Sequence, residues 1–303
     1  MEGIMMKNME KYAVAVRKPD HEIEVKSGIY VSLSERYPVL RLPILRGIVA
    51  FGESLYIGMK TLTQSAEYFE EEEQVEPGKA EKFLTKVFGD KLESLVMGFT
   101  LCLSVVLAVG IFMLLPFYLS HLLRGFIHSY SIRTLIEGLI RVSIFLLYMV
   151  LITKMEEINR VFMYHGAEHK TINCLEHGED LTPDNIMKHS RLHKRCGTSF
   201  LLIVMIVSIV VFMFIRAESL LWKLLLRVLL VPLVAGIAYE FIRLAGRSKG
   251  GIMDLLSRPG MCLQYLTTRE PDKEMVEVAV AAVEGVFDWK AYLEAMHNGE
   301  LED

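Results

Sequence analysis

Histidine is concentrated in one short stretch of this chain, and imidazole is the commonest protein ligand for metals. Five of the nine histidines lie in this stretch: His165, His169, His177, His189 and His193. Two of the four cysteines, Cys174 and Cys196, lie within it or directly after it. Imidazole and thiolate are both ligands that zinc prefers. The sequence therefore points to metal chemistry in this stretch.

The segment from His165 to His169 has the pattern H-x-x-E-H, with Glu168 as its acidic residue. In a helix, the two histidines lie one turn apart on one face, where both could bind the same metal ion. Glu168 would project beside them and could accept a proton from a water activated by that ion. This is the order of the inverted zincins, the reverse of H-E-x-x-H. The spacing predicts a metal site with Glu168 as the catalytic base.

A catalytic zinc site usually has three protein ligands and one open position. His193 and Cys196 form an H-x-x-C segment directly before an apolar stretch, and either can supply the third ligand. Glu240 is the alternative, because inverted zincins take a glutamate far downstream as their third ligand. We expect Zn²⁺ as the cofactor. The residues are compatible with a structural zinc as well as a catalytic one, and Glu168 favours the catalytic site.

The other residues of this stretch have simpler interpretations. We expect His177 and His189 to be solvated, and we do not expect Cys174 to be a ligand. Thr182 followed by Pro183 is typical of a helix start, with threonine as the cap and proline in the first turn. A short helix over 183–191 is therefore predicted to carry His189.

Long uncharged runs determine the elements that position these residues. Positions 94–123 and 196–215 contain no Asp, Glu, Lys or Arg, and about 20 apolar helical residues span a bilayer core of about 30 Å. In the second predicted span, Glu137 and Arg141 have the i, i+4 spacing of a same-face ion pair. An ordinary soluble enzyme is excluded. We predict four transmembrane helices, at about 95–120, 135–153, 197–215 and 221–242.

Charge and cysteine content exclude further classes of protein. The formal net charge of −4 gives no support for a nucleic-acid partner, and four cysteines are too few for a disulfide framework. Fifteen Lys and Arg residues flank the spans on the side of the loop 154–195, against four on the other side. The positive-inside rule then makes this loop and both termini cytoplasmic. We predict a multi-pass plasma-membrane protein whose partners are membrane lipid and an unidentified substrate or protein.

The remaining segments are less regular. Alternating apolar residues on both sides of Lys18-Pro19-Asp20 predict a β-hairpin. Residues 38–66 are apolar but interrupted by Gly, Pro and Arg, so an interfacial or re-entrant helix pair is preferred over a single amphipathic helix. The predicted fold is mainly α, a polytopic membrane protein with about four transmembrane helices and a small N-terminal β-hairpin. Its segments are 1–35 (hairpin), 36–92 (interfacial or re-entrant helices and an acidic linker), 93–153 (spans one and two), 154–196 (cytoplasmic His/Cys-rich loop with the metal site), 197–243 (spans three and four) and 244–303 (cytoplasmic segment with an amphipathic helix).

Four longer segments are distinctive in combination: LPILRGIVAFGESL at 42–55, HGAEHKTINCLEHGEDLT at 165–182, SRLHKRCGTSF at 190–200 and AYEFIRLAGR at 238–247. They resemble the YqhQ-like family of bacterial membrane proteins, and the resemblance extends over nearly the whole chain. The function of that family is unknown, although its members are sometimes described as predicted metal-dependent enzymes. The resemblance implies metal and catalytic candidates at His165, Glu168, His169, His193 and Cys196. His21 stands where the family commonly has a turn glycine, which disfavours a tight turn in the hairpin.

Three functions agree with these features. The one we favour is an integral membrane zinc hydrolase that acts near the cytoplasmic face on a peptide, amide or ester bond. The alternative is a non-enzymatic scaffold or adaptor whose structural zinc folds the cytoplasmic loop. The third is a transporter or channel, which the charged residues within the spans favour and the lack of an internal repeat disfavours.

Overall fold

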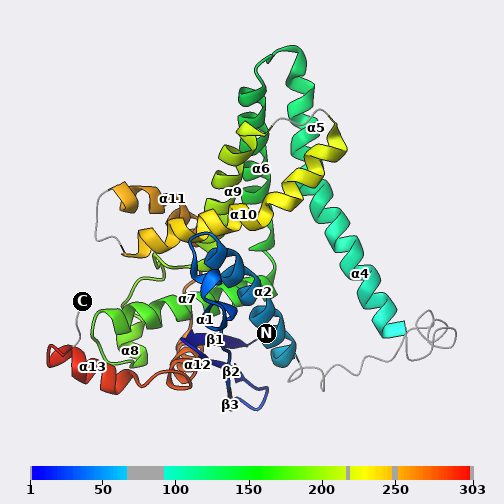
Figure 1. Ribbon diagram of the computed structural model, residues 1–303. Helices are drawn as coiled ribbons and strands as arrows, with labels where there is room; N and C mark the ends of the chain where they lie inside the picture. Colours follow the sequence, from blue (N-terminus) through cyan, green and yellow to red (C-terminus); the bar gives the residue numbers. More distant parts are fainter. Residues whose placement is uncertain (1, 67–91, 216–218, 248–251, 301–303) are drawn as a thin grey trace. The chain divides into compact units, whose positions relative to one another are not determined.

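The protein is mainly α-helical, with one small sheet at its N-terminus (Figure 1). The computed structural model describes residues 2–66, 92–215, 219–247 and 252–300. The chain forms two compact units. The first contains the described parts of Met1–Phe69, Tyr148–Val207 and Val228–Asp303, and the second contains those of Glu70–Leu147 and Ser208–Arg227.

Four helical stretches are long and apolar enough to cross a membrane: Gly98–Gly125, Tyr130–Ile152, Gly197–Phe214 and Leu221–Ala245. The four predicted spans are confirmed in number, and their ends lie within about five residues of the predicted ones. The predicted ion pair is also present, with 3.4 Å between Arg141 Nη2 and Glu137 Oε1. The elements concerned are α4 (Leu92–Val109), the π-helical η3 (Gly110–Leu114), α5 (Leu115–Leu122), η4 (Leu123–Gly125), α6 (Tyr130–Ile152), α9 (Gly197–Phe214) and α10 (Leu220–Arg247).

The N-terminal sheet has three antiparallel strands in the order β1 (Gly3–Asn8), β2 (Lys11–Arg17) and β3 (Ile23–Ile29). The predicted hairpin is the β2–β3 pair, and β1 was missed. The turn between β1 and β2 has only Met9 and Glu10 at its centre, with none of the Asn-Gly or Asp-Gly signals of a two-residue hairpin. His21 lies in the β2–β3 connection with φ at +66°, the left-handed conformation that glycine adopts more easily.

Residues 38–66 form one long helix rather than the preferred helix pair. After α1 (Leu33–Arg36) and the single 3₁₀ turn η1 (Pro38–Arg41), α2 runs without interruption from Leu45 to Ala66. The prediction of a pair was wrong because its glycines were taken as helix breaks. Gly47 instead lets α2 approach α10 closely, since a Cβ atom there would lie 2.9 Å from Gly236 Cα. α2 is not among the four stretches that meet the length and hydropathy of a membrane span.

The other helices of the first unit build a core on the sheet. α7 (Glu156–Glu176) and α12 (Lys273–Glu284) contact each other and β1, and Figure 1 shows α12 beside the strands. The buried face of α12 includes Val276, Ala279 and Val283, which are three and four residues apart, as on one face of a helix. The predicted C-terminal amphipathic helix is divided between α12 and α13 (Trp289–His297), because Asp288 caps a new helix.

Two further elements complete the surroundings of the histidine-rich stretch. α8 spans Pro183–Ile186 with Thr182 as its cap, so the start of the predicted helix is confirmed. Its end is not, because the chain leaves the helix before His189. α11 (Ile252–Thr267) lies between α10 and α12 along the chain.

Candidate metal centre

Three of the predicted ligands lie together in the first unit. α7 is helical over the whole H-x-x-E-H segment, and the ring centroids of His165 and His169 are 4.3 Å apart. Cys196 directly precedes α9, and its Sγ lies 3.2 Å from His165 Nε2. One ligand atom from each of the three residues lies within 4.8 Å of the other two. Ligand atoms on a tetrahedral zinc are about 3.6 Å apart, so this group could hold a zinc-sized cation.

Both imidazoles are oriented by backbone carbonyl groups. His165 Nδ1 lies 2.8 Å from the carbonyl oxygen of Thr267, and His169 Nδ1 lies 2.6 Å from that of Arg191. A carbonyl oxygen only accepts, so each Nδ1 must carry a proton, and in the neutral form of each ring Nε2 has a lone pair for a metal. Histidines that bind metals in proteins usually donate their second ring N–H in this way.

Cys196 has the surroundings of a reactive or metal-binding thiolate. Its sulfur accepts a hydrogen bond from the amide of Thr198 at 3.3 Å, in the capping position at the start of α9. Burial acts to raise the pKa of this thiol, but its interaction with His169 and the hydrogen bonds with Thr198 bring the pKa below its ordinary value. The thiolate is the form that binds metals.

Cys174 has the opposite surroundings, in a second group with Glu179 and His189 whose ligand atoms lie within 4.8 Å of one another. Its thiol is fully buried in the core of the first unit and contacts the carbonyl oxygens of Glu179 and Asp180 at 3.7 and 3.6 Å. Burial raises the pKa of Cys174 to about 11. This thiol therefore stays protonated and packs as a small apolar residue. The His189 ring is only 12% exposed, so its predicted solvation was wrong.

Two side chains of α7 hold the irregular segment that leads to Cys196. Lys170 Nζ and Asn173 Nδ2 donate hydrogen bonds of 2.6–3.0 Å to backbone carbonyl oxygens of that segment. Neither residue was predicted to have a role, although Asn173 is four residues after His169 and shares its helix face. The carbonyl groups concerned are those of Met187, His189, Ser190 and Leu192.

Gln264 of α11 holds the same segment from the other side. Its Oε1 accepts from His193 N and its Nε2 donates to His193 O, both at 2.8 Å, and Nε2 also donates to Ser199 Oγ at 2.8 Å. The side chain is completely buried. The signal that could have found Gln264 is a single amide within the apolar stretch from Met261 to Leu266.

The remaining predicted site residues differ in their positions. Glu168 is half-buried, and burial raises the pKa of its carboxyl group, although the nearby His165 and His193 act to lower it. The His193 ring centroid is 5.8 Å from that of His169. His193 Nε2 lies 3.3 Å from Glu176 Oε2, and His193 is not one of the three grouped ligands.

The structure does not bring Glu240 to this group. Its carboxylate is held by the guanidinium of Arg46 through both oxygens, and it also accepts from Ile44 N at 3.3 Å. Glu240 therefore joins α10 to the start of α2.

An apolar pocket of about 420 Å³ adjoins the candidate metal centre. Cys196 contributes to its wall, together with Arg195 and residues of three helices, α2, α9 and α10. This volume falls in the range of small-molecule sites, about 300–1,000 Å³. The other lining residues are Ala50, Phe51, Ser54, Leu55, Gly197, Phe200, Tyr239 and Ile242.

Comparisons with known proteins cover this whole region. The family model described as "Protein of unknown function (DUF1385)" matches residues 42–289. "Uncharacterized protein YqhQ" of Bacillus subtilis (strain 168) is 33% identical over 290 residues, which cover 92% of this chain and 88% of that protein. No solved structure matches the chain. Neither description names a metal or a reaction.

Proposed function

The chain belongs to the DUF1385 family of proteins of unknown function, and from that premise we propose that it is a metal-dependent, zinc-preferring hydrolase of the membrane. The observation that carries the proposal is the group of His165, His169 and Cys196, with Glu168 on the same turn of α7. The apolar helices support a membrane location. Positive charge on the flanks of the spans supports a cytoplasmic site.

The number of ligands supports a catalytic site over a structural one. Structural zinc sites are closed by four protein ligands, whereas catalytic sites use three and keep one position for water or substrate. Within the described residues, the group contains three ligands. The His193 ring centroid lies 5.8 Å from that of His169, but its Nε2 lies 3.3 Å from the Glu176 carboxylate instead. When bound, a zinc ion would supply Lewis acidity, which polarises a carbonyl group and acidifies water near neutral pH.

Glu168 is the residue that would move the proton. Its carboxylate takes a proton from the attacking water as the water oxygen forms a bond with the carbonyl carbon of the substrate. It then returns the proton to the departing oxygen or nitrogen as the ester or amide bond breaks. His165 and His169 would hold the cation through Nε2, because the carbonyl oxygens of Thr267 and Arg191 occupy their Nδ1 atoms.

The apolar pocket supports a substrate with a hydrocarbon chain. Phe51, Leu55 and Phe200 line it, and Cys196 places it beside the candidate metal centre. Each buried methylene contributes about 0.8 kcal/mol of binding free energy. A fatty-acyl ester or amide could therefore place its chain in the pocket and its carbonyl group at the metal. Arg195, also on the wall of the pocket, suits a negatively charged group on such a substrate.

Elemental analysis of the purified full-length protein tests the metal centre. We expect about one equivalent of zinc in the wild type, and its loss in His165→Ala, His169→Ala and Cys196→Ser. Cys174→Ser is the matched control for the thiol and is expected to keep the metal, as is Glu240→Gln. Wild-type protein without stoichiometric metal, or equal loss in the two cysteine variants, would contradict the proposal.

Hydrolysis of fluorogenic acyl esters tests the reaction. Glu168→Gln is expected to keep its zinc and to lose about 10²–10⁴-fold in rate. Ala50→Phe, which fills the pocket, should slow hydrolysis of an octanoyl ester more than that of an acetyl ester. If Glu168→Gln loses the metal, Glu168 is a ligand and the proposed mechanism is wrong. A wild type that keeps zinc but hydrolyses no ester or amide probe would instead favour the scaffold with a structural zinc.

A further inference from the structure

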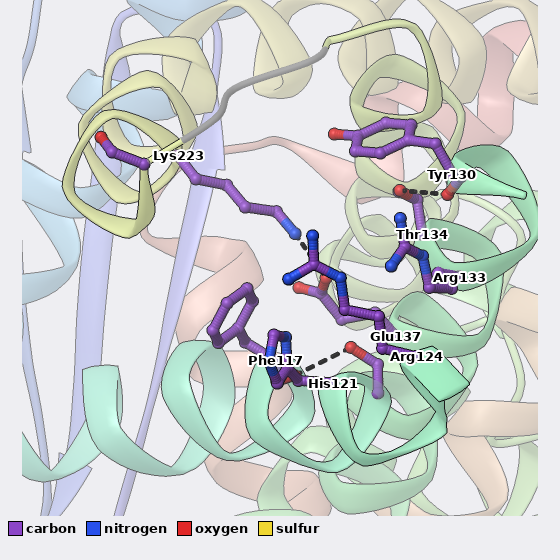
Figure 2. A pocket seen from close by; sticks show the side chains of 10 residues that line it. Phe117, His121, Arg124, Tyr130, Arg133, Thr134, Glu137 and Lys223 are labelled. Carbon is purple, nitrogen blue, oxygen red and sulfur yellow. Dashed lines mark hydrogen bonds and ion pairs between the residues drawn. The ribbon is translucent and has the colours of Figure 1, made fainter. Parts of the chain in front are cut away.

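A second pocket, of about 310 Å³, lies in the other unit, among residues of α5, η4, α6 and α10 (Figure 2). It is polar, whereas the pocket beside Cys196 is apolar. It lies where α5 ends and where α6 and α10 begin, so it is at one end of three of the four candidate membrane spans. By the positive-inside rule this is the end we predict to be extracytoplasmic.

Cations outnumber carboxylates in and behind this pocket. Glu137 is 2% exposed and is shared by three cations. Lys223 Nζ lies 3.0 Å from its Oε2, Arg141 Nη2 lies 3.4 Å from its Oε1, and Arg227 also pairs with Oε1. One carboxylate therefore faces three positive charges, and the cations at the rim of the pocket add to this excess.

The rim adds two more guanidinium groups, Arg124 and Arg133. Figure 2 shows Arg124, Lys223 and Glu137 converging in the pocket. Among the described residues, neither Arg124 nor Arg133 has a carboxylate within ion-pair distance. Arg124 is exposed and Arg133 half-buried, so both can reach a bound molecule.

Unbalanced positive charge at the end of a membrane span draws an anion, because the low dielectric constant of the surroundings strengthens each interaction. Guanidinium groups bind phosphate through paired hydrogen bonds, and lysine adds a point charge. We propose that this pocket binds a phosphate-bearing anion, either the headgroup of an anionic phospholipid or a free phosphate compound. Its position at the ends of the spans places it at the depth of lipid headgroups.

Titration calorimetry on the full-length protein in a neutral detergent tests this site with three probes: dioctanoyl phosphatidylglycerol, dioctanoyl phosphatidylcholine and inorganic phosphate. The phosphatidylglycerol is expected to bind more tightly than the phosphatidylcholine. Its affinity should fall by more than about tenfold in Arg124→Gln/Arg133→Gln. Added salt should weaken binding to the wild type. Arg160→Gln, a change to a surface arginine of the other unit, is the matched control and should leave binding unchanged.

The three probes distinguish the two sources of the anion. Binding of inorganic phosphate with the same loss in the double variant, and no preference between the lipids, assigns the site to a soluble phosphate compound. Arg124→Gln alone changes an exposed side chain and is expected to fold, so it provides the same comparison if the double variant does not. No binding of either anion to the wild type, or an equal loss in Arg160→Gln, would overturn the proposal.

Discussion

Gly166 is the second residue of the H-x-x-E-H segment, and the structure leaves no room for a side chain there. A Cβ atom on Gly166 would lie 3.1 Å from the carbonyl carbon of Arg269. It would come closer still to the carbonyl oxygen, which projects towards α7 by one C=O bond of about 1.2 Å. This is backbone against backbone, and Arg269 N is itself tied to Phe162 O at 2.8 Å. A methyl group therefore cannot be accommodated by rotation of a side chain.

The energetic cost can be worked from two opposing effects. Replacing glycine by alanine within a helix stabilises it by about 1 kcal/mol. Overpacking of a filled site costs about 1–3 kcal/mol, and a backbone overlap lies at the upper end of that range. We expect Gly166→Ala to lose about 2 kcal/mol of unfolding free energy, which corresponds to about 4–8 °C in melting temperature. The added methyl group should also displace the backbone around Thr267, whose carbonyl group orients His165. This displacement should weaken zinc binding by about 10–100-fold.

Gly52→Ala is the matched control, because no atom lies within 4 Å of a Cβ atom built at Gly52 in α2. It should melt at the wild-type temperature or slightly above it. The assays are thermal melting in detergent and zinc affinity measured by competition with a chelator. If Gly166→Ala melts and binds zinc like Gly52→Ala, the close approach of α7 to Arg269 does not exist in solution, and the reasoning that connects it to the metal centre fails.

Two further predictions concern groups that hold the site and the sheet. Gln264→Leu removes the buried amide that forms hydrogen bonds with both backbone groups of His193, and should lower the unfolding free energy by about 2–4 kcal/mol and weaken zinc binding in the chelator assay. Gln264→Glu can still accept from His193 N and should lose less unfolding free energy. Equal values for wild type and Gln264→Leu would contradict this role. Glu2 accepts two hydrogen bonds of 2.6 Å from Arg160. Burial acts to raise the pKa of Glu2, but the hydrogen bonds from Arg160 and Tyr164 bring the pKa below its ordinary value. A carboxyl group with a lowered folded-state pKa stabilises the fold above its unfolded pKa, and this contribution is lost as the pH falls through the folded value. Glu2→Gln should therefore melt below the wild type at pH 7, with the gap closing in melts below about pH 4; a gap that is independent of pH would refute the ion pair as its source.

The sequence by itself determined the features that depend on local composition. The four apolar stretches are set by the hydrophobic effect and by helix length, so their number and positions could be predicted within a few residues. The turn between His165 and His169 is likewise local, because i, i+4 spacing places two side chains on one face of any helix. Cys196 could be named as a candidate, but it could not be separated from His193 or Glu240.

Only the tertiary structure shows which of those three candidates lies beside His165 and His169. Cys196 lies beside the two imidazoles because Lys170, Asn173 and Gln264 bind the backbone that precedes it. These contacts join that segment to α7, 17–19 residues earlier, and to α11, 71 residues later.

Glu240 is excluded from the group for a similar reason, since its charge is matched by Arg46, almost two hundred residues earlier. Hydrogen bonds and ion pairs act over about 3 Å in space, whatever the separation along the chain. The partners of these polar and charged groups therefore depend on how the helices pack. The pattern of residues along the sequence does not predict this packing.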